Sequence, residues 1–117
     1  MLKVIFILTF LFTAFILCQN KNSTSFNYDH DCPTWLKMKI DSLTNNLDNA
    51  GTEVYRYDWN ERFVYHIHIP INSCVFCLLF DQNGNKIQFA SNDMISNFEK
   101  NRKSKMLIWE RKMNQEN

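Results

Sequence analysis

The stretch that decides the fold is VFCLLFDQNGNKIQF, which runs from Val75 to Phe89. It consists of an apolar run, a polar segment that contains Asn83-Gly84, and a second short apolar run. Asn-Gly between apolar runs is a strong signal for a β-hairpin, because both residues tolerate a positive φ. The pattern therefore predicts two antiparallel strands joined by this turn, with Phe80 opposite Ile87.

A second hairpin is predicted immediately before the first. Residues 52–58 and 63–69 each alternate between two kinds of side chain, as strands do. A three-residue loop at 60–62 places Tyr57 opposite Tyr65 and collects the aromatic side chains on one face. A two-residue loop would mix the two faces, so the register argument favours the longer one. The aromatic face is interpreted as core rather than as a ligand-stacking surface.

Helices are predicted on both sides of these strands. Cys32-Pro33 favours a helix start, since proline is well tolerated at the first helical position. An apolar stripe at spacings of four, three and four follows, formed by Leu36, Ile40, Leu43 and Leu47. Ser91 can cap a second, shorter helix. The apolar run 106–109 fits a final strand or a continuation of that helix, and we favour the strand.

The predicted fold class is α+β, with an N-terminal helix packed on an antiparallel β-meander. The meander has four strands, or five if 106–109 is also a strand. The domain organisation follows as a signal peptide at 1–18, a flexible tether at 19–31, one domain at 32–112 and a disordered tail at 113–117. A chain of 117 residues has room for only one such domain.

The N-terminus predicts export. Lys3 precedes a nearly continuous apolar run at 4–17, which is the length of a signal-peptide core and short for a membrane-spanning helix. Cys18 then stands where a bacterial lipoprotein would carry its lipid, although Leu17 is larger than the residue usually found before that cysteine. Lipidation at Cys18 and simple secretion both remain open. The expected location is the periplasm, the outer membrane as a lipoprotein, or the extracellular space.

The overall charge limits the class of partner. Lys and Arg together number 13 and Asp and Glu 12, so the formal net charge is +1. That balance gives no basic footprint for nucleic acid. Contact with a membrane is expected only through an N-terminal lipid, and an unknown protein or surface partner is the remaining class.

Several motifs together resemble a known group of proteins. These are Cys32 before a helix, the strand residues 54–57, Val64-Tyr65, Cys74 before an apolar strand, and Phe80-Asp81-Gln82-Asn83-Gly84-Asn85. Over residues 32–89 the chain resembles small secreted or lipid-anchored domains of unknown function from Bacteroidota. It departs from them in the spacing of its last two cysteines and in lacking a glycine-rich segment after the final strand. The resemblance implies no reaction.

Three cysteines lie in the predicted domain. Cys74 and Cys77 cannot bond each other within a regular strand, since three strand steps separate their Cα atoms by about 10 Å, beyond the roughly 7 Å limit. In a regular strand, Cys74 would point to the same face as Phe76, Leu78 and Phe80, which is the face assigned to the helix. Cys32 begins that helix. The sequence therefore predicts a Cys32–Cys74 disulfide and a free thiol at Cys77. A bulge near Cys74 would favour Cys77 instead.

The candidate binding face is formed by Arg56, Asp58, His66 and His68, which the predicted register places on the polar side of the first hairpin. Two histidines and a cysteine could bind zinc, but no fourth ligand is evident. The spacing Cys74-Val75-Phe76-Cys77 is that of a redox pair, without the following helix that such pairs need. We therefore expect no metal, no cofactor and no catalytic residue.

The sequence leaves three functional classes open. We favour a non-catalytic exported binding module at the cell envelope. The alternatives are a small hydrolase or metal-dependent enzyme that uses the His66/His68 face, and an inhibitor or immunity-like protein. Function belongs to sites rather than to folds, so the fold class does not decide among them.

Overall fold

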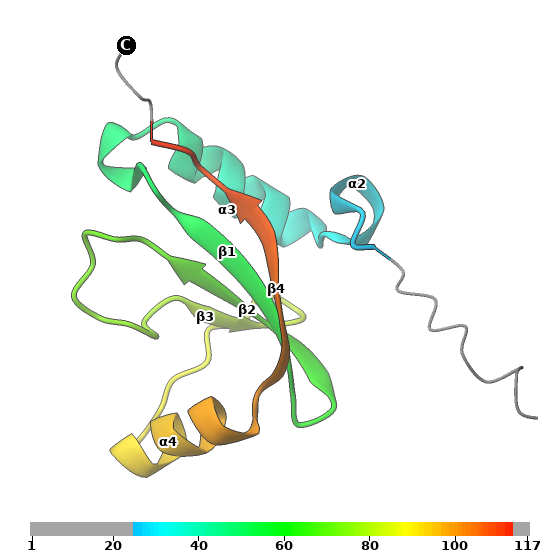
Figure 1. The fold of residues 1–117 in the computed structure, drawn as a ribbon, viewed down its shortest axis with the longest axis vertical. Helices are drawn as coiled ribbons and strands as arrows, with labels where there is room; N and C mark the ends of the chain where they lie inside the picture. The colour runs from blue at the N-terminus through cyan, green and yellow to red at the C-terminus, as the bar shows by residue number, and fades with distance from the viewer. Residues whose placement is uncertain (1–24, 114–117) are drawn as a thin grey trace, which may run out of the picture.

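The computed structural model describes residues 25–113. The elements in chain order are α2 (Tyr28–Asp31), α3 (Thr34–Thr44), a 3₁₀ turn η1 (Leu47–Asn49), β1 (Glu53–Trp59), β2 (Arg62–His68), β3 (Leu79–Asp81), α4 (Asn92–Asn101) and β4 (Lys103–Glu110). The strands form one antiparallel sheet in the order β3-β2-β1-β4, shown in Figure 1. The prediction of a mixed α+β fold with a four-stranded antiparallel sheet is confirmed.

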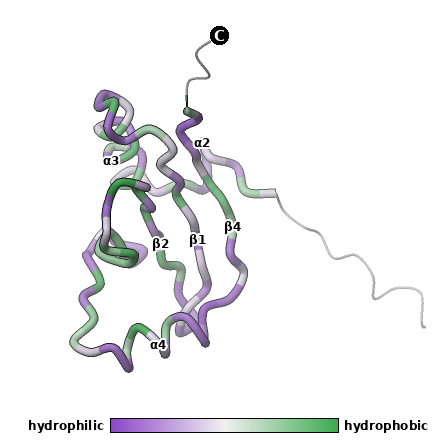
Figure 2. The backbone as a smooth tube through the Cα atoms, turned by 60° about the vertical axis from the view of Figure 1, so that its left-hand side comes forward, coloured by the Kyte–Doolittle hydropathy of each residue, from purple (hydrophilic) through white to green (hydrophobic). Residues whose placement is uncertain are grey.

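The order of the strands corrects the predicted meander. The first three strands are neighbours in sequence order, but β4 returns to the free edge of β1. The fourth strand is thus the segment around 106–109, as favoured above, and not Ile87–Phe89. Figure 2 shows β4 changing from hydrophilic near α4 to hydrophobic in the middle of the strand.

The first hairpin has the loop that register reasoning rejected. Trp59 pairs with Arg62, and Tyr57 lies opposite Val64. The two loop residues have positive φ angles, 51° at Asn60 and 62° at Glu61, as in the tight turns that match strand twist. The prediction was wrong because it assumed one buried sheet face, whereas both faces are covered.

One face packs against α3. Leu36 and Ile40, which are 0% and 2% exposed, contact the side chains that β1 and β2 direct to this side. The buried members from the sheet are Val54, Tyr65, Ile67, Ile69, Phe80 and Ile108. We call this the α3 face. Leu47 does not continue the helical stripe as predicted, because the helix ends at Thr44 and Leu47 is 80% exposed in η1.

The opposite face packs against α4 and is rich in aromatic residues. Ser91 accepts a hydrogen bond from the backbone N–H of Met94 and caps the helix, as predicted. Phe98, which is 0% exposed, is the central side chain, and its ring contacts Tyr57, Trp59, Phe76 and Phe89. Tyr57, Val64 and Leu79 are buried with it. We call this the α4 face.

The second hairpin differs in detail from its prediction. Its turn at Gly84 is present, but the loop comprises three residues, 82–84, and Phe80 bridges Lys86 rather than Ile87. The Asp81 carboxylate accepts hydrogen bonds from the backbone N–H groups of Asn83 and Asn85. A type I turn followed by a residue with positive φ is the usual form of a three-residue hairpin loop, and Gly84 has φ 87°.

The ordered body begins before the predicted boundary at residue 32. The side chain of Asn27 caps the short helix α2 within the segment predicted to be a tether, and Phe26 and Tyr28 pack against the core on the α3 face. These two aromatic side chains give the segment enough apolar area to pack. The predicted signal peptide and Cys18 lie outside the described residues. None of the helices within residues 25–113 has the length and hydropathy to cross a membrane.

Candidate functional site

The predicted binding face does not exist as one surface. In the observed register, His66 and His68 lie on the α4 face, whereas Arg56 and Asp58 lie on the α3 face. The Arg56 guanidinium lies over the rings of Phe63 and Phe26, with its carbon atom 4.2 Å and 5.0 Å from their centroids. Arg56 and Asp58 are therefore separated from the two histidines by the sheet.

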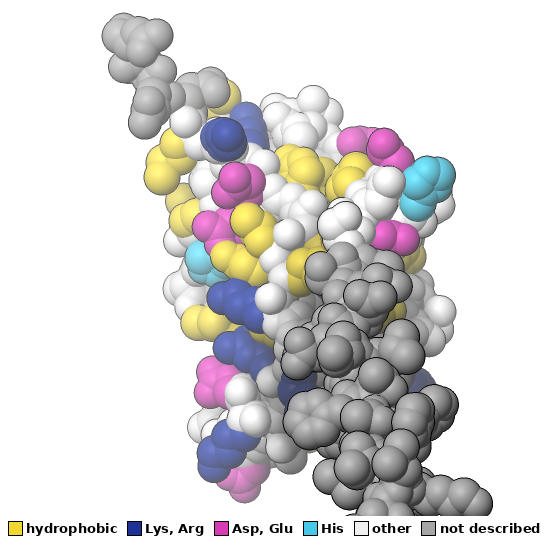
Figure 3. Space-filling model, turned by 45° about the vertical axis from the view of Figure 1, so that its right-hand side comes forward, with side chains coloured by type: hydrophobic (Ala, Val, Ile, Leu, Met, Phe, Trp, Pro, Cys, Tyr) yellow, Lys and Arg dark blue, Asp and Glu magenta, His cyan; other side chains and the backbone are white. Residues whose placement is uncertain are grey.

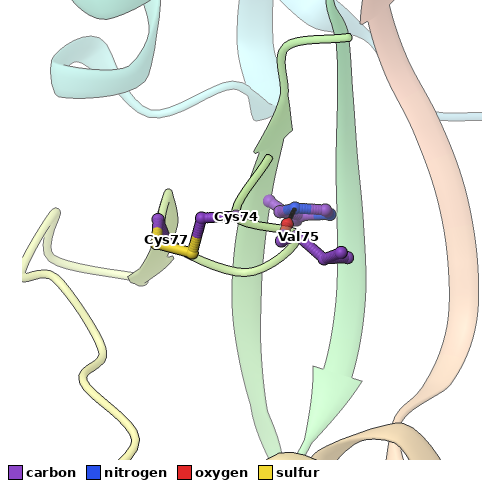
Figure 4. Close-up of a disulfide and its surroundings, with 4 residues drawn as sticks. Cys74, Val75 and Cys77 are labelled. Carbon is purple, nitrogen blue, oxygen red and sulfur yellow. Dashed lines mark hydrogen bonds between the residues drawn. A yellow bond between two sulfur atoms is a disulfide. The ribbon is translucent and has the colours of Figure 1, made fainter. Parts of the chain in front are cut away.

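The predicted disulfide is also wrong. Cys74 is bonded to Cys77, and Cys32 is a buried free thiol whose pKa burial raises. The distance argument failed because the chain from 75 to 78 forms a turn and enters β3 only at Leu79, which brings the two Cα atoms to 5.6 Å. Figure 4 shows the resulting small closed loop.

His66 anchors this loop to the sheet. Its side chain is 4% exposed, and its Nε2 lies 2.6 Å from the carbonyl oxygen of Val75, between the two bonded cysteines. Because a carbonyl oxygen only accepts, Nε2 must carry the proton. Burial lowers the pKa of His66; the hydrogen bond to Val75 opposes this, and the charges of His68, Arg102 and Lys105 add to the lowering. His66 thus makes a structural hydrogen bond that joins the disulfide loop to β2.

Beside His66 the α4 face has a hollow of about 280 Å³. It is lined by Glu53, Tyr55, Tyr57, His66, His68, Val75, Phe76, Arg102 and Lys105. We call it the basic hollow. Residues from β1, β2, the disulfide loop, the end of α4 and β4 meet there, so it depends on the pairing of β4 with β1.

Arg102 is the most distinctive side chain of the basic hollow. The carbon of its guanidinium lies 4.7 Å, 5.2 Å and 5.4 Å from the ring centroids of Tyr57, Phe98 and Phe76. These are cation–π distances, and three rings fix the position of the charge. Among residues 25–113 the guanidinium has neither an acidic partner nor a hydrogen-bond acceptor, so its donors are available to a ligand.

A second cation stands at the same hollow. The Lys105 ammonium lies 4.3 Å from the centroid of the Tyr55 ring. The Tyr55 hydroxyl donates to the carboxylate of Glu53, and this hydrogen bond, with burial, raises the pKa of Tyr55 to about 12. Among the described residues, the acidic side chain that lines the hollow, Glu53, therefore accepts from a neutral phenol, while both cations contact aromatic rings and have no acidic partner. Figure 3 shows, on one face, Lys and Arg side chains beside hydrophobic ones.

The structure gives little support to metal chemistry at the histidines. Within the part of the chain that the structure describes, no three His, Cys, Asp or Glu side chains come together in a way that could hold a metal ion. The thiol of Cys77, the third ligand considered from the sequence, is in the disulfide.

Sequence reasoning missed Arg102, Lys105 and Glu53. The segment 101–105 was recognisable as basic, but its place opposite His66 depends on β4 pairing with β1, which no local pattern specifies. A search of protein-family models, curated proteins and solved structures finds no match to this chain.

Proposed function

We propose that this protein is an exported, non-catalytic binding module, and that its basic hollow binds an anionic group of a partner at the cell envelope. The observation that carries the proposal is Arg102, whose charge is positioned by three aromatic rings and whose donors have no acceptor among the described residues. Buried or half-buried cations usually have a partner, because a charge without one is costly to remove from water. An anionic ligand would supply it.

The ligand class follows from the donor set. A guanidinium binds carboxylate and phosphate oxygens in a two-pronged manner, and an ammonium adds a second charge without a directional demand. Carboxylate and phosphate share this chemistry, so the ligand is an oxyanion carried by a protein or an envelope surface. The tyrosine rings beside the two cations offer apolar contact to the rest of the ligand.

The hydrolase alternative has weaker support. A general base must reach the proton that it removes, and the Nε2 atom of His66 is occupied by the carbonyl oxygen of Val75. His68 alone lacks an orienting partner among the described residues. The third class, an inhibitor or immunity-like protein, has no specific observation in its favour.

Export is part of the proposal. The apolar run at 4–17 motivates it, and a disulfide in a small domain is more typical of an oxidising compartment. Mass spectrometry of the N-terminus of the native protein tests it. A start at Gln19, or a lipid-modified Cys18, is expected, and an intact Met1 in the native protein would overturn it.

Binding is tested with the full chain and two simple probes, inorganic phosphate and acetate. We expect NMR shifts of the His68 and Lys105 signals that saturate with one or both ions, and the stronger ion identifies the oxyanion. The matched pair is Arg102→Met, which keeps the packing on the rings but removes the donors, and Arg62→Met at an exposed position beside the turn of the first hairpin. Loss of binding in the former alone supports the proposal, and equal binding in both overturns it.

A further inference from the structure

The disulfide loop has features that the anion-binding proposal does not use. Cys74 and Cys77 are both exposed to solvent, and the bond closes a loop with only two residues between the cysteines. In the chain-entropy model the stabilisation from a disulfide grows with the size of the loop that it closes. A bond across so short a loop therefore contributes less to folding than a long-range bond would.

The disulfide also lines a hollow of its own. A cavity of about 600 Å³ adjoins it, with an apolar wall formed by Val75, Phe76, Ile87, Phe89 and Ile95. Lys86 and Glu99 stand among its other lining residues. Ile87 donates a backbone hydrogen bond to the carbonyl oxygen of Leu79, so the edge of β3 is covered there, but both cysteines line the cavity and remain exposed. Another chain thus has room to approach the sulfur atoms from this side.

The loop is coupled to the basic hollow at two points. Val75 accepts the hydrogen bond of the buried His66, and the ring of Phe76 lies 5.2 Å from the imidazole and 5.3 Å from the ring of Phe98. Phe76 is also one of the three rings under Arg102. In Figure 4, Val75 lies toward the paired strands while the disulfide closes the loop beside it.

From these observations we propose that Cys74–Cys77 is a thiol–disulfide exchange site for an external dithiol, and that its reduction loosens the wall of the basic hollow. Exposure and an approach path are what exchange requires, and exposed disulfides are the ones that exchange most readily. The proposal goes beyond anion binding and stands without it.

The exchange proceeds in two displacements. A thiolate of the dithiol attacks one sulfur of the pair, a mixed disulfide forms, and the other cysteine leaves as a thiolate, which Lys86 at the cavity can stabilise. The second thiol of the partner then displaces the first cysteine. The partner ends as a disulfide, and Cys74 and Cys77 gain the two electrons and, at neutral pH, two protons. Without the disulfide, the positions of Val75 and Phe76 beside the basic hollow depend on non-covalent contacts such as those with His66.

The test uses the oxidised full chain and dithiothreitol, with alkylation and peptide mapping of each cysteine over time. The buried Cys32 thiol is an internal control, because its alkylation reports opening of the core. We expect Cys74 and Cys77 to become alkylated at least about tenfold faster than Cys32, since local opening is faster than global unfolding. An excess of oxidised glutathione should restore the bond. Reaction of all three thiols at one rate would overturn the proposal.

A second measurement tests the coupling independently of any anion. The NMR signals of the His66 imidazole should shift on reduction. In the double variant Cys74→Ser with Cys77→Ser they should stand near the reduced position and not respond to dithiothreitol. Identical His66 signals in the oxidised and reduced wild-type protein would show that reduction leaves the wall unchanged and would overturn the coupling.

Discussion

The two faces of the sheet differ in what their side chains do. On the α3 face, aliphatic side chains such as Leu36 and Ile40 fill the core, and Arg56 packs over Phe63 and donates to the Met106 sulfur. On the α4 face, Arg102 and Lys105 lie over aromatic rings, and a hollow and the disulfide are close to them. Both faces therefore contain buried core, but only on the α4 face does a hollow lined by cations lie beside that core, and we propose that the ligand binds there.

The largest expected effect is on the α3 face. Leu36→Ala removes a fully buried side chain, and core truncations of this kind lower the free energy of unfolding by about 2–5 kcal/mol. Chemical denaturation measures the change. Met38→Ala on the same helix, at a position that is 68% exposed, is the control and should change stability little. Equal effects of the two substitutions would mean that α3 does not pack as described.

A somewhat smaller effect is expected at Gly84, where the second hairpin meets α3. Its φ is 87°, and an added Cβ would lie 2.8 Å from Cδ2 of Trp35, whose indole N–H donates to the carbonyl oxygen of Gln82. Gly84→Ala should therefore lower stability by about 1–3 kcal/mol through backbone strain and this contact.

Gly51→Ala is a matched control for that substitution. Its φ of 78° is similar, but the added Cβ meets a side-chain atom of Pro70 at 3.3 Å and side-chain atoms of Met113 at 3.7 Å and 3.8 Å, all at longer distances than the Trp35 ring at Gly84. Comparing the melting temperatures of the two variants separates the cost of backbone strain, which both share, from the cost of the contact with Trp35. The larger loss of stability is expected at Gly84, and the reverse order would contradict the packing of Trp35 on this turn.

On the α4 face, His66 should matter for stability and His68 should not. His66→Ala leaves the Val75 carbonyl without its donor, at a cost of about 1–3 kcal/mol. The half-exposed His68 should tolerate alanine within about 0.5 kcal/mol. Urea unfolding at pH 8 measures both, and a larger effect at His68 would remove the structural role given to His66.

The pH dependence of stability sharpens the same comparison. The pKa of His66 is lower in the folded protein than the ordinary 6.5, so the unfolded chain binds its proton first as pH falls. The contribution of His66 is therefore complete above pH 6.5 and is lost as pH falls from there through the folded pKa. His66→Ala should flatten the stability profile in that window, whereas a profile parallel to that of the wild type would contradict the lowered pKa.

Local patterns predicted the elements better than their contacts. The stripe at Leu36 and Ile40, the Ser91 cap and the strand at 106–109 depend on neighbouring residues, and all three are present. The register of the first hairpin was wrong because burial of both faces depends on α4 crossing to the far side. The disulfide prediction was wrong for a related reason, because no local signal shows that β3 begins only at Leu79.

The basic hollow was beyond sequence reasoning. The residues that line it come from β1, β2, the disulfide loop and β4, which are up to half the chain apart in sequence. Half of the predicted face, His66 and His68, lies at the hollow, while Arg56 and Asp58 do not. Only the long-range pairing of β4 with β1 brings Lys105 to the Tyr55 ring.

We propose that Arg102 binds an oxyanion rather than stabilising the fold. The most direct measurement is a phosphate titration, with acetate in parallel, of the wild-type chain and of Arg102→Met, followed by NMR together with the melting temperature of each. We expect at least about tenfold weaker binding in the variant, because one charge-assisted pair is lost, and nearly unchanged stability. Undiminished binding in Arg102→Met, or no saturable binding in the wild type to either ion, would contradict it.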